Sequence, residues 1–398
     1  MPDSQSTEKV FPVMSAYGRF PVTIVKGKGS YVWDDAGNKY LDYTSGIAVC
    51  ALGHVPDAVG AVLKKQLDTL WHCSNLFHIA SQEKLAGMLT DLTCCDQVFF
   101  CNSGAEANEG AIKLARRYAH LINKKEKGHI VTFNHSFHGR TMATLTATAQ
   151  AKIQDGFGPL VPGFTYLPYN DMSAIRALEV DDDAIAVMLE MVQGEGGVIP
   201  ADPEWVSALA EVCQKKGILL MVDEVQTGFG RTGSLFAYQQ YHIEPDVITV
   251  AKALGSGIPI GAFLAKKEVS QVFTPGTHGS TFGGNPFSTM AGIATLEAFK
   301  KQHVIEQCRE NAACLNEKLK ALKEKYPDKI ETVRGKGLLI GVVTTFPAIN
   351  AVNRLREKHH VLILTAGKQV LRILPPLVTQ KDEIDRFIYA LDDVLKNS

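Results

Sequence analysis

The stretch Asp246-Val-Ile-Thr-Val-Ala-Lys-Ala-Leu-Gly255 decides the fold, because a short β-branched run ends there on Lys252 and breaks at a glycine. A second apolar run, Ile218-Leu-Leu-Met-Val222, ends in Asp223-Glu224. Runs of this length and composition are typical of strands buried on both faces of a parallel sheet. Each strand therefore places a charged side chain at its carboxyl end, where the ligands of such sheets collect.

The same pattern recurs between about residues 55 and 290, where helical periodicity alternates with short apolar runs. Three further runs are predicted to be strands: 97–101, 129–133 and 184–189. This alternation predicts an α/β layer with a mostly parallel sheet and helical crossovers. Polar residues follow each of these runs: Asn102-Ser103, Asn134-His135 and Glu190. The sequence therefore predicts a single site at one edge of the sheet.

The two ends of the chain predict a second, smaller region. Strands and turns are expected before residue 45, with a hairpin over residues 31–42 around the turn Asp35-Ala-Gly-Asn38. Helices are expected over residues 288–299 and 304–326, and strands within 333–342 and 370–377. We predict an N-terminal segment of the small domain at 1–54, a large domain at 55–290 and a C-terminal small domain at 291–398.

Composition narrows the class of protein. A chain of 398 residues has room for two domains, and a net charge of −1 gives no global field for nucleic acid or an anionic membrane. The first eight residues are polar, and no apolar stretch approaches the ~18 residues of a membrane span. Eight cysteines without a Cys-x-x-Cys pair indicate reduced thiols. We expect a cytoplasmic protein with no nucleic-acid or membrane partner.

A lysine and an acid at neighbouring strand ends suit an enzyme that holds a carbonyl cofactor as a Schiff base, with the acid facing a protonated ring nitrogen. Residues 102–109, Asn-Ser-Gly-Ala-Glu-Ala-Asn-Glu, open a helix whose free N–H groups could hold a phosphate. The pair Ser103 and Glu106 is also a capping box, which needs no ligand. The glycine-rich turn His278-Gly-Ser-Thr-Phe-Gly-Gly-Asn-Pro286 offers a second set of phosphate donors or is a plain loop.

Three other motifs point to weaker alternatives. The run 219–224 resembles a Walker B strand, but the sequence has no Gly-x4-Gly-Lys-[Ser/Thr]. The match Gly228-Phe-Gly-Arg-Thr-Gly233 to a dinucleotide fingerprint does not directly follow its strand. His135 and His138 have no third ligand at suitable spacing, so no metal site is expected. An aromatic ring for stacking and an arginine for a carboxylate fit residues 133–140 better.

Taken together, these segments resemble the class III (ornithine-type) aminotransferases of the fold-type I pyridoxal-phosphate family. The resemblance runs from residue 29 to residue 377 and depends most on Asp223-Glu-Val-Gln-Thr-Gly-x-Gly-Arg-Thr-Gly with Lys252. It implies a large domain with a mostly parallel seven-stranded sheet and a smaller α+β domain built from both termini. It also implies a homodimer whose two active sites are shared between the subunits.

The resemblance implies pyridoxal 5′-phosphate as the cofactor. Lys252 and Asp223 would be the catalytic residues, since Lys252 would bind the cofactor and move the proton while Asp223 holds the ring nitrogen. The further expected cofactor contacts are Ser103, Gly104, Ala105, Phe137, His138, Glu190 and Gln226, with Thr281 from the neighbouring subunit. Ala105 stands where the family usually has threonine, so one hydroxyl contact with the phosphate is in doubt.

The resemblance also implies two clamps for carboxylates. Arg372 would hold the α-carboxylate of glutamate, Glu190 would pair with Arg372 when an ω-amine is bound, and Arg140 would hold the distal carboxylate. Tyr17 and Ser280 complete the expected substrate contacts. Within the family, segments 45–49, 137–140 and 235–239 resemble the acetylornithine branch most, whereas residues 52–57 and 190–191 depart from it.

That branch implies ping-pong transfer of the δ-amine of N-acetyl-L-ornithine to 2-oxoglutarate, giving N-acetylglutamate semialdehyde and L-glutamate in arginine biosynthesis. Ornithine, succinylornithine and 4-aminobutyrate are the alternative donors within the family. A Schiff-base aldolase and a binding homologue without cofactor are the alternatives from other classes. An aldolase would carry no bound chromophore, and a binding homologue would have lost Lys252 or Asp223.

Overall fold

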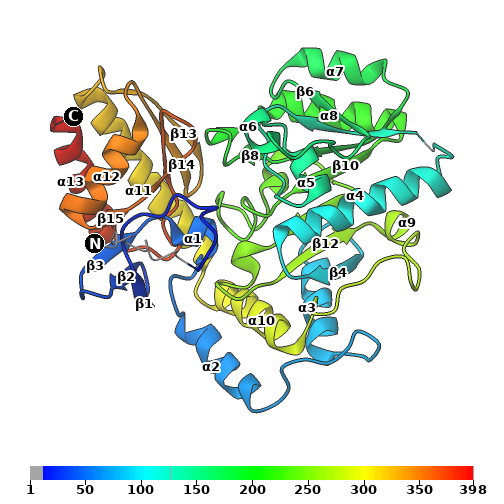
Figure 1. Cartoon of the computed structure of the whole chain (residues 1–398), viewed down its shortest axis with the longest axis horizontal. Coiled ribbons are helices and arrows are strands. Elements are labelled where there is room, and N and C mark those ends of the chain that lie inside the picture. Colours follow the sequence, from blue (N-terminus) through cyan, green and yellow to red (C-terminus); the bar gives the residue numbers. More distant parts are fainter. Residues whose placement is uncertain (1–11, 126, 398) are drawn as a thin grey trace, which may run out of the picture.

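The computed structural model describes residues 12–125 and 127–397, so the polar segment at residues 1–8 lies outside the described residues. Two lobes face each other across a waist, with the seven-stranded sheet in one lobe and the chain ends in the other (Figure 1). No helix among the described residues is long and apolar enough to cross a membrane. All eight cysteines are free, in agreement with the expected reduced thiols.

The larger lobe is built on a sheet of strand order β4-β12-β11-β10-β7-β5-β6. Its strands are β4 (Gln97–Cys101), β5 (His129–Phe133), β6 (Phe164–Leu167), β7 (Ala184–Leu189), β10 (Leu219–Asp223), β11 (Val247–Val250) and β12 (Gly261–Ala265). All neighbours are parallel except β12, which is antiparallel to both β11 and β4. Every residue of β7, β10, β11 and β12 is buried, as expected of a sheet covered on both faces. The predicted mostly parallel seven-stranded sheet is confirmed.

Helices cover both faces of this sheet, and their ends carry the expected sequence signals. Asp202 caps α8 by accepting the N–H of Glu204, Pro203 opens the helix and Gly217 ends it at a φ of 65°. The helices of this part of the chain are α2 (Asp57–Leu67), α3 (Ala80–Thr90), α4 (Gly104–Leu121), α5 (Met142–Ala147), α6 (Ala151–Gln154), α7 (Met172–Glu179), α8 (Pro203–Lys216), α9 (Lys267–Ser270) and α10 (Pro286–Lys301). A short hairpin, β8 (Val192–Gln193) with β9 (Ile199–Pro200), follows β7.

The smaller lobe joins both ends of the chain. One sheet has the order β1-β2-β3-β15 and comprises β1 (Ile24–Lys28), β2 (Tyr31–Asp34), β3 (Lys39–Asp42) and β15 (Val361–Leu362). The other has the order β13-β14-β17-β16 and comprises β13 (Ile330–Lys336), β14 (Leu339–Thr344), β16 (Leu364–Thr365) and β17 (Val370–Ile373). Helices α11 (Val304–Lys325), α12 (Ala348–His359) and α13 (Lys381–Lys396) complete it. The hairpin expected over residues 31–42 is confirmed, and the domain boundaries at 54/55 and 290/291 stay a prediction.

Two segments position the site: a turn between the lobes and a loop within the larger lobe. The turn labelled α1 (Ser45–Ala48) has left-handed backbone at four consecutive residues. It is also bonded to the C-terminal part of the chain, because Ser45 Oγ donates to Leu374 O at 2.6 Å. Val49, at the end of this turn, lines the cavity of the larger lobe. Residues 251–260 connect β11 to β12, and because β12 runs in reverse this loop begins and ends at the same edge of the sheet.

Candidate active site

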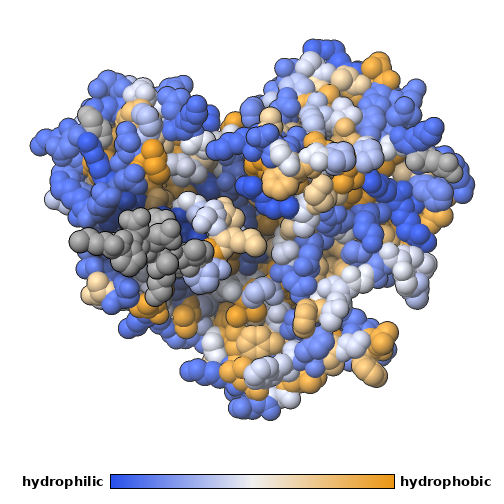
Figure 2. Space-filling model, viewed as in Figure 1, coloured by the Kyte–Doolittle hydropathy of each residue, from blue (hydrophilic) through white to orange (hydrophobic). Residues whose placement is uncertain are grey.

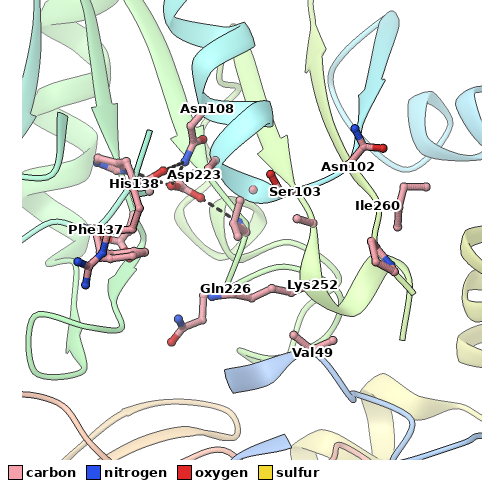
Figure 3. A pocket seen from close by; sticks show the side chains of 18 of the residues that line it. Val49, Asn102, Ser103, Asn108, Phe137, His138, Asp223, Gln226, Lys252 and Ile260 are labelled. Atoms are coloured by element: carbon pink, nitrogen blue, oxygen red, sulfur yellow. Dashed lines mark hydrogen bonds and ion pairs between the residues drawn. The ribbon is translucent and has the colours of Figure 1, made fainter. Parts of the chain in front are cut away.

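A cavity of about 440 Å³ lies at the carboxyl ends of the parallel strands. Ten of the residues expected at the site line it: Ser103, Gly104, Ala105, Phe137, His138, Arg140, Glu190, Asp223, Gln226 and Lys252. Figure 3 shows the labelled members of this set converging on one space from α4, the loop after β5 and the ends of β10 and β11. The structure therefore brings together residues that are up to about 150 positions apart in the sequence.

Lys252 extends into the cavity between Gln226 and Val49 (Figure 3). Its backbone has a φ of 45°, a left-handed conformation that turns the chain sharply after β11. The pKa of Lys252 is lowered to about 8, mainly by burial and also by the charge of Arg372. The carboxylates of Glu195, Asp223 and Glu190 act in the opposite direction without cancelling this effect. An amine with this pKa is uncharged in about a tenth of the molecules at pH 7, far more than an ordinary lysine, and the uncharged amine is the nucleophilic form.

Asp223, the last residue of β10, is 3% exposed and held by a fixed set of donors. Its Oδ2 accepts from His138 Nδ1 and from Asn108 Nδ2, each at 2.8 Å, and its Oδ1 accepts from Val225 N–H at 3.0 Å. Burial disfavours the charged form of His138, but the bond and charge of Asp223 outweigh it and raise the pKa of His138. These three donors fix the orientation of the carboxylate beside the cavity.

Asn108 did not feature among the residues expected from the sequence. It lies one helical turn after Gly104 on α4, and its Nδ2 also donates to His138 O at 2.7 Å. The sequence could have indicated Asn108, because it follows Gly104 by four residues and residues i and i+4 share a helix face. Asn108 therefore joins the first turns of α4 to Asp223, the acid at the other side of the cavity.

The amino end of α4 offers a seat for an anion. Ser103 caps the helix by accepting the N–H of Glu106 at 3.2 Å, and Glu106 Oε2 accepts from Asn102 N–H at 2.8 Å. The first amides of a helix have no carbonyl partner within it, so those of Gly104 and Ala105 are available to a ligand. A Cβ at Gly104 would lie 2.6 Å from Val225 Cγ1, so only glycine lets the loop after β10 approach this helix end.

Gln226 reaches the cavity from the same loop with an unused acceptor. Its Oε1 is buried and, among the described residues, has no hydrogen-bond partner. A buried amide oxygen without a partner costs free energy unless a ligand supplies the donor. A cavity with a lysine, a buried carboxylate opposite, an unsatisfied amide and a helix N-terminus fits a phosphorylated, aromatic, carbonyl-bearing cofactor.

Phe137 lines one side of the cavity, and its backbone is fixed by Glu190 at the end of β7. Glu190 Oε2 accepts the Phe137 N–H at 2.9 Å, and burial raises the pKa of Glu190 to about 7 although His138 lowers it. Arg140 is exposed, with its guanidinium 5.6 Å from the centre of the Phe137 ring. The aromatic ring and the arginine thus lie together at the mouth of the cavity.

The expected pairing of Glu190 with Arg372 is wrong in this structure. Arg372, on β17, is 3% exposed and forms its ion pair with Glu195, and it also donates to Gly194 O at 3.4 Å. Both acids occur in the motif Glu190-Met-Val-Gln-Gly-Glu195. The hairpin that begins at β8 turns the second acid toward the smaller lobe, whereas the first stays at the sheet with Phe137.

Arg372 does not line the cavity, and three further residues expected at the site lie elsewhere in this chain. Ser280 and Thr281 line a different hollow, near His72 and Asn75, where Ser280 O accepts from Asn75 Nδ2 at 3.0 Å. Thr281 is exposed. Tyr17 is 77% exposed, 6.0 Å from the Arg19 guanidinium, and does not line the cavity.

Comparison with known proteins agrees with this geometry. The family model for class-III aminotransferases matches residues 13–395. The chain is 55% identical to the acetylornithine aminotransferase of Oceanobacillus iheyensis, over 98% of this chain and 97% of the relative. It is 48% identical to the acetylornithine aminotransferase of Bacillus subtilis, over 96% and 97%.

Solved structures give the same result. The ornithine aminotransferase of Toxoplasma gondii superimposes with a TM-score of 0.93 at 31% identity, covering 97% of this chain and 92% of that one. The acetylornithine aminotransferase of Elizabethkingia anophelis superimposes with a TM-score of 0.86 at 29% identity, covering 97% and 96%. With the lysine, the acid and the helix end meeting in one cavity, these matches show that the chain belongs to the class-III aminotransferases.

Proposed function

We propose that this protein is a pyridoxal-phosphate-dependent aminotransferase that moves the δ-amine of N-acetyl-L-ornithine to 2-oxoglutarate in arginine biosynthesis. The observation that carries the proposal is the meeting of Lys252 and Asp223 in one cavity of a class-III aminotransferase. The names of the two relatives above, at 55% and 48% identity, support the choice of donor. When bound, the cofactor supplies an electron-accepting ring that stabilises negative charge at the reacting carbon.

In this proposal the two catalytic residues have complementary tasks. The Lys252 amine would hold the cofactor and would move a proton at the reacting carbon of the substrate. Asp223 holds a proton on the ring nitrogen, since a buried carboxylate is a strong acceptor for a cationic N–H. His138 and Asn108 act as positioning residues, because their hydrogen bonds fix the Asp223 carboxylate.

The remaining cofactor contacts follow from the lining of the cavity. The amides of Gly104 and Ala105 and the Ser103 hydroxyl bind the phosphate, and the helix dipole of α4 favours its charge. Phe137 would hold the ring by stacking, and the unsatisfied Gln226 Oε1 would accept a hydrogen bond from the ring hydroxyl. Glu190 supports the stack through the Phe137 backbone and therefore acts through another residue.

Two arginines would bind substrate carboxylates. Arg140, exposed at the cavity mouth, binds the carboxylate distant from the reacting amine, and Arg372 binds the α-carboxylate of glutamate. Glu195 neutralises Arg372 while the acetylornithine amine occupies the site, since no second carboxylate then needs the arginine. Binding of a dicarboxylate substrate would displace Glu195 and release the guanidinium.

A screen of single half-reactions tests the choice of donor. The holoenzyme is mixed separately with N-acetylornithine, ornithine, succinylornithine and 4-aminobutyrate, and the loss of the cofactor's visible absorption is followed in one turnover. We expect N-acetylornithine to give the highest ratio of rate to apparent dissociation constant. A higher ratio for 4-aminobutyrate or ornithine would assign the enzyme to another branch of the family.

The variant Arg372→Ala should separate the two half-reactions. We expect the glutamate half-reaction to lose about 100-fold or more in kcat/KM, because a charged hydrogen-bonded pair is lost, and the N-acetylornithine half-reaction to change little. Stopped-flow absorption with each substrate alone measures both. The matched variant Arg334→Ala removes another arginine of the smaller lobe, bonded to Gly197 O, and serves as the control. Equal losses in both half-reactions would contradict the two-clamp assignment.

We propose that the working form is a homodimer with shared active sites. Exposed apolar side chains gather on the segment after α2 and on the loop beyond β12: Leu67, Leu70, Trp71, Leu76, Phe77 and Phe282. Apolar surface appears below the waist in Figure 2, in the region of α2 and α10. Contiguous apolar surface of this kind is typical of an interface, and the hollow beside it contains Ser280 and Thr281. In this arrangement Thr281 serves the phosphate site of the partner subunit.

Hybrid dimers test this arrangement. Lys252→Ala and Thr281→Glu are each expected to be inactive as homodimers, the second because an added carboxylate repels the phosphate. After co-expression, one of the two sites in each hybrid has both Lys252 and Thr281, so random pairing restores about a quarter of the wild-type specific activity. Absence of recovery in purified hybrids would show that Thr281 serves the site of its own chain.

The same proposal places the enzyme in the cytoplasm, acting on small molecules without nucleic-acid or membrane partners. Its eight free cysteines suit a reducing compartment, where disulfides are rare. The net charge of −1 gives no general attraction to polyanions. Local arginines and a helix end carry the binding of anions instead.

A further inference from the structure

A second cluster of reactive side chains lies outside the cavity, where the chain leaves the left-handed turn at residues 45–48. His54 Nε2 donates to Asp42 Oδ2 at 2.7 Å, and the other ring nitrogen, Nδ1, lies 3.8 Å from Cys50 Sγ. Thiol, imidazole and carboxylate thus stand in series, the arrangement that activates a nucleophilic cysteine. None of these three residues has a part in the proposed transamination.

The imidazole of this cluster is a cation at neutral pH. The Asp42 carboxylate, followed by the Cys50 sulfur, raises the pKa of His54 to about 10 against the effect of burial. Both ring nitrogens then carry protons, and the Nδ1–H points to the sulfur. A sulfur that accepts from an imidazolium is stabilised as the thiolate, which is the nucleophilic form of cysteine.

The position of His54 is fixed by the backbone around it. Gly29 and His54 exchange backbone hydrogen bonds at 3.0 and 2.8 Å. A Cβ at Gly27 would lie 2.8 Å from His54 Cβ, so glycine at this position lets the imidazole pack against β1. Asp42 is fixed as well, because its Oδ1 accepts from the Thr44 N–H at 2.8 Å.

A buried arginine of the larger lobe interacts electrostatically with Cys308 and, more weakly, with Cys50. Arg231 is 1% exposed, and its Nη1 donates to Leu338 O at 3.0 Å and Pro375 O at 2.6 Å. Its Nη2 is buried without a partner in the part of the chain that the structure describes. Burial lowers the pKa of Arg231 to about 10, and negative charge on Cys308 or Cys50 opposes this shift. The contacts of His54 with Cys50 and with Asp42 therefore remain the geometric basis for an activated Cys50.

We propose that Cys50 is an activated thiol and a site of reversible modification by small disulfides. The Cys50 sulfur forms a bond to one sulfur of the disulfide, whose S–S bond breaks, and the other sulfur leaves as a thiol with the proton that Cys50 lost. The thiol is half-buried, so a compact reagent can reach it. Val49, the preceding residue, lines the active-site cavity, so a group added to Cys50 is attached one residue away from the cavity lining.

The rate of mixed-disulfide formation tests this assignment. The holoenzyme is treated at neutral pH with dithiodipyridine, released thiopyridone is followed by absorbance, and the modified residue is located by mass spectrometry. Cys314 on α11, also half-buried and near Lys318, is the matched internal reference. We expect Cys50 to react about tenfold faster than Cys314 or more.

Two variants make the result specific to the cluster. Asp42→Asn keeps the shape of the side chain, and His54→Gln removes the imidazole. Each should slow modification of Cys50 about tenfold while the rate at Cys314 is unchanged. Thermal unfolding and cofactor absorption confirm that the variants are folded, and Cys50→Ser should abolish the fast phase. A Cys50 rate no higher than that of Cys314, or unchanged in both folded variants, would overturn the proposal.

Discussion

Replacing Lys252 by alanine is expected to lower turnover by about 10⁴-fold or more, the largest effect of any single change in this protein. Lys252 is the only group in the proposed mechanism that both attaches the cofactor and moves a proton at the substrate carbon. The phosphate seat at α4 and the Asp223 carboxylate remain in the variant, so pyridoxal phosphate should still bind. Steady-state turnover, together with the bound cofactor measured by absorbance, distinguishes loss of chemistry from loss of binding.

Lys266 offers a matched control for that experiment. It also follows a buried strand, but β12 runs in reverse, so Lys266 lies at the opposite edge of the sheet and pairs with Asp246 at 3.2 Å. Lys266→Ala should keep turnover within about twofold of the wild type, because this half-buried ion pair lies at the edge of the sheet opposite the cavity. If the Lys252 variant turned over at a rate near that of the Lys266 variant, the proton-transfer role would be wrong.

The second large effect is expected for Asp223→Asn, which should lower kcat by about 10³-fold. The substitution keeps the size of the side chain but removes the negative charge that would hold the proton on the ring nitrogen. An asparagine at this position could also place its N–H donors against Asn108 Nδ2 or His138 Nδ1, which both donate to Asp223 in the wild type. Single-turnover rates with N-acetylornithine measure the effect without interference from product release.

Asp246→Asn is the control for this variant. Asp246 precedes β11 at the other edge of the sheet, where its carboxylate accepts the Leu220 N–H at 2.9 Å and pairs with Lys266. Its substitution should lower stability to thermal unfolding while leaving the single-turnover rate close to that of the wild type. A rate for Asp223→Asn within tenfold of the wild type would contradict its role at the cofactor.

Much of the larger lobe could be predicted because buried parallel strands read as unbroken apolar runs. Five of its strands were predicted from such runs, from Gln97–Cys101 to Val247–Val250. The direction of β12, Gly-Ala-Phe-Leu-Ala, could not be predicted, because a run buried on both faces has no feature that distinguishes the two directions. β6 was not predicted either, since only intermediate and exposed residues form this edge strand and its pattern is weak.

The site was predictable where residues follow strand ends, and less so where loops or subunits decide their position. Lys252, Asp223 and the α4 motif lie in the cavity because strand direction fixes them. The choice between Glu190 and Glu195 as partner of Arg372 depends on how a hairpin turns, which five residues of sequence do not specify. Ser280 and Thr281 lie outside the cavity of their own chain, and the role proposed for Thr281 needs a second chain that a single sequence does not place.

Because β12 runs in reverse, one loop positions both Lys252 and the amino end of α4. Residues 251–260 leave the sheet with Lys252 and return to it beside β4, where Gly261 packs closely on the backbone of Ser103. The span of the loop is therefore fixed, because both of its ends join strands at the same edge of the sheet. Lengthening or shortening the loop would move the Lys252 amine relative to the amino end of α4, where the phosphate is expected to bind. We therefore expect that the enzyme tolerates many changes of side chain within residues 251–260, whereas insertions and deletions there impair it.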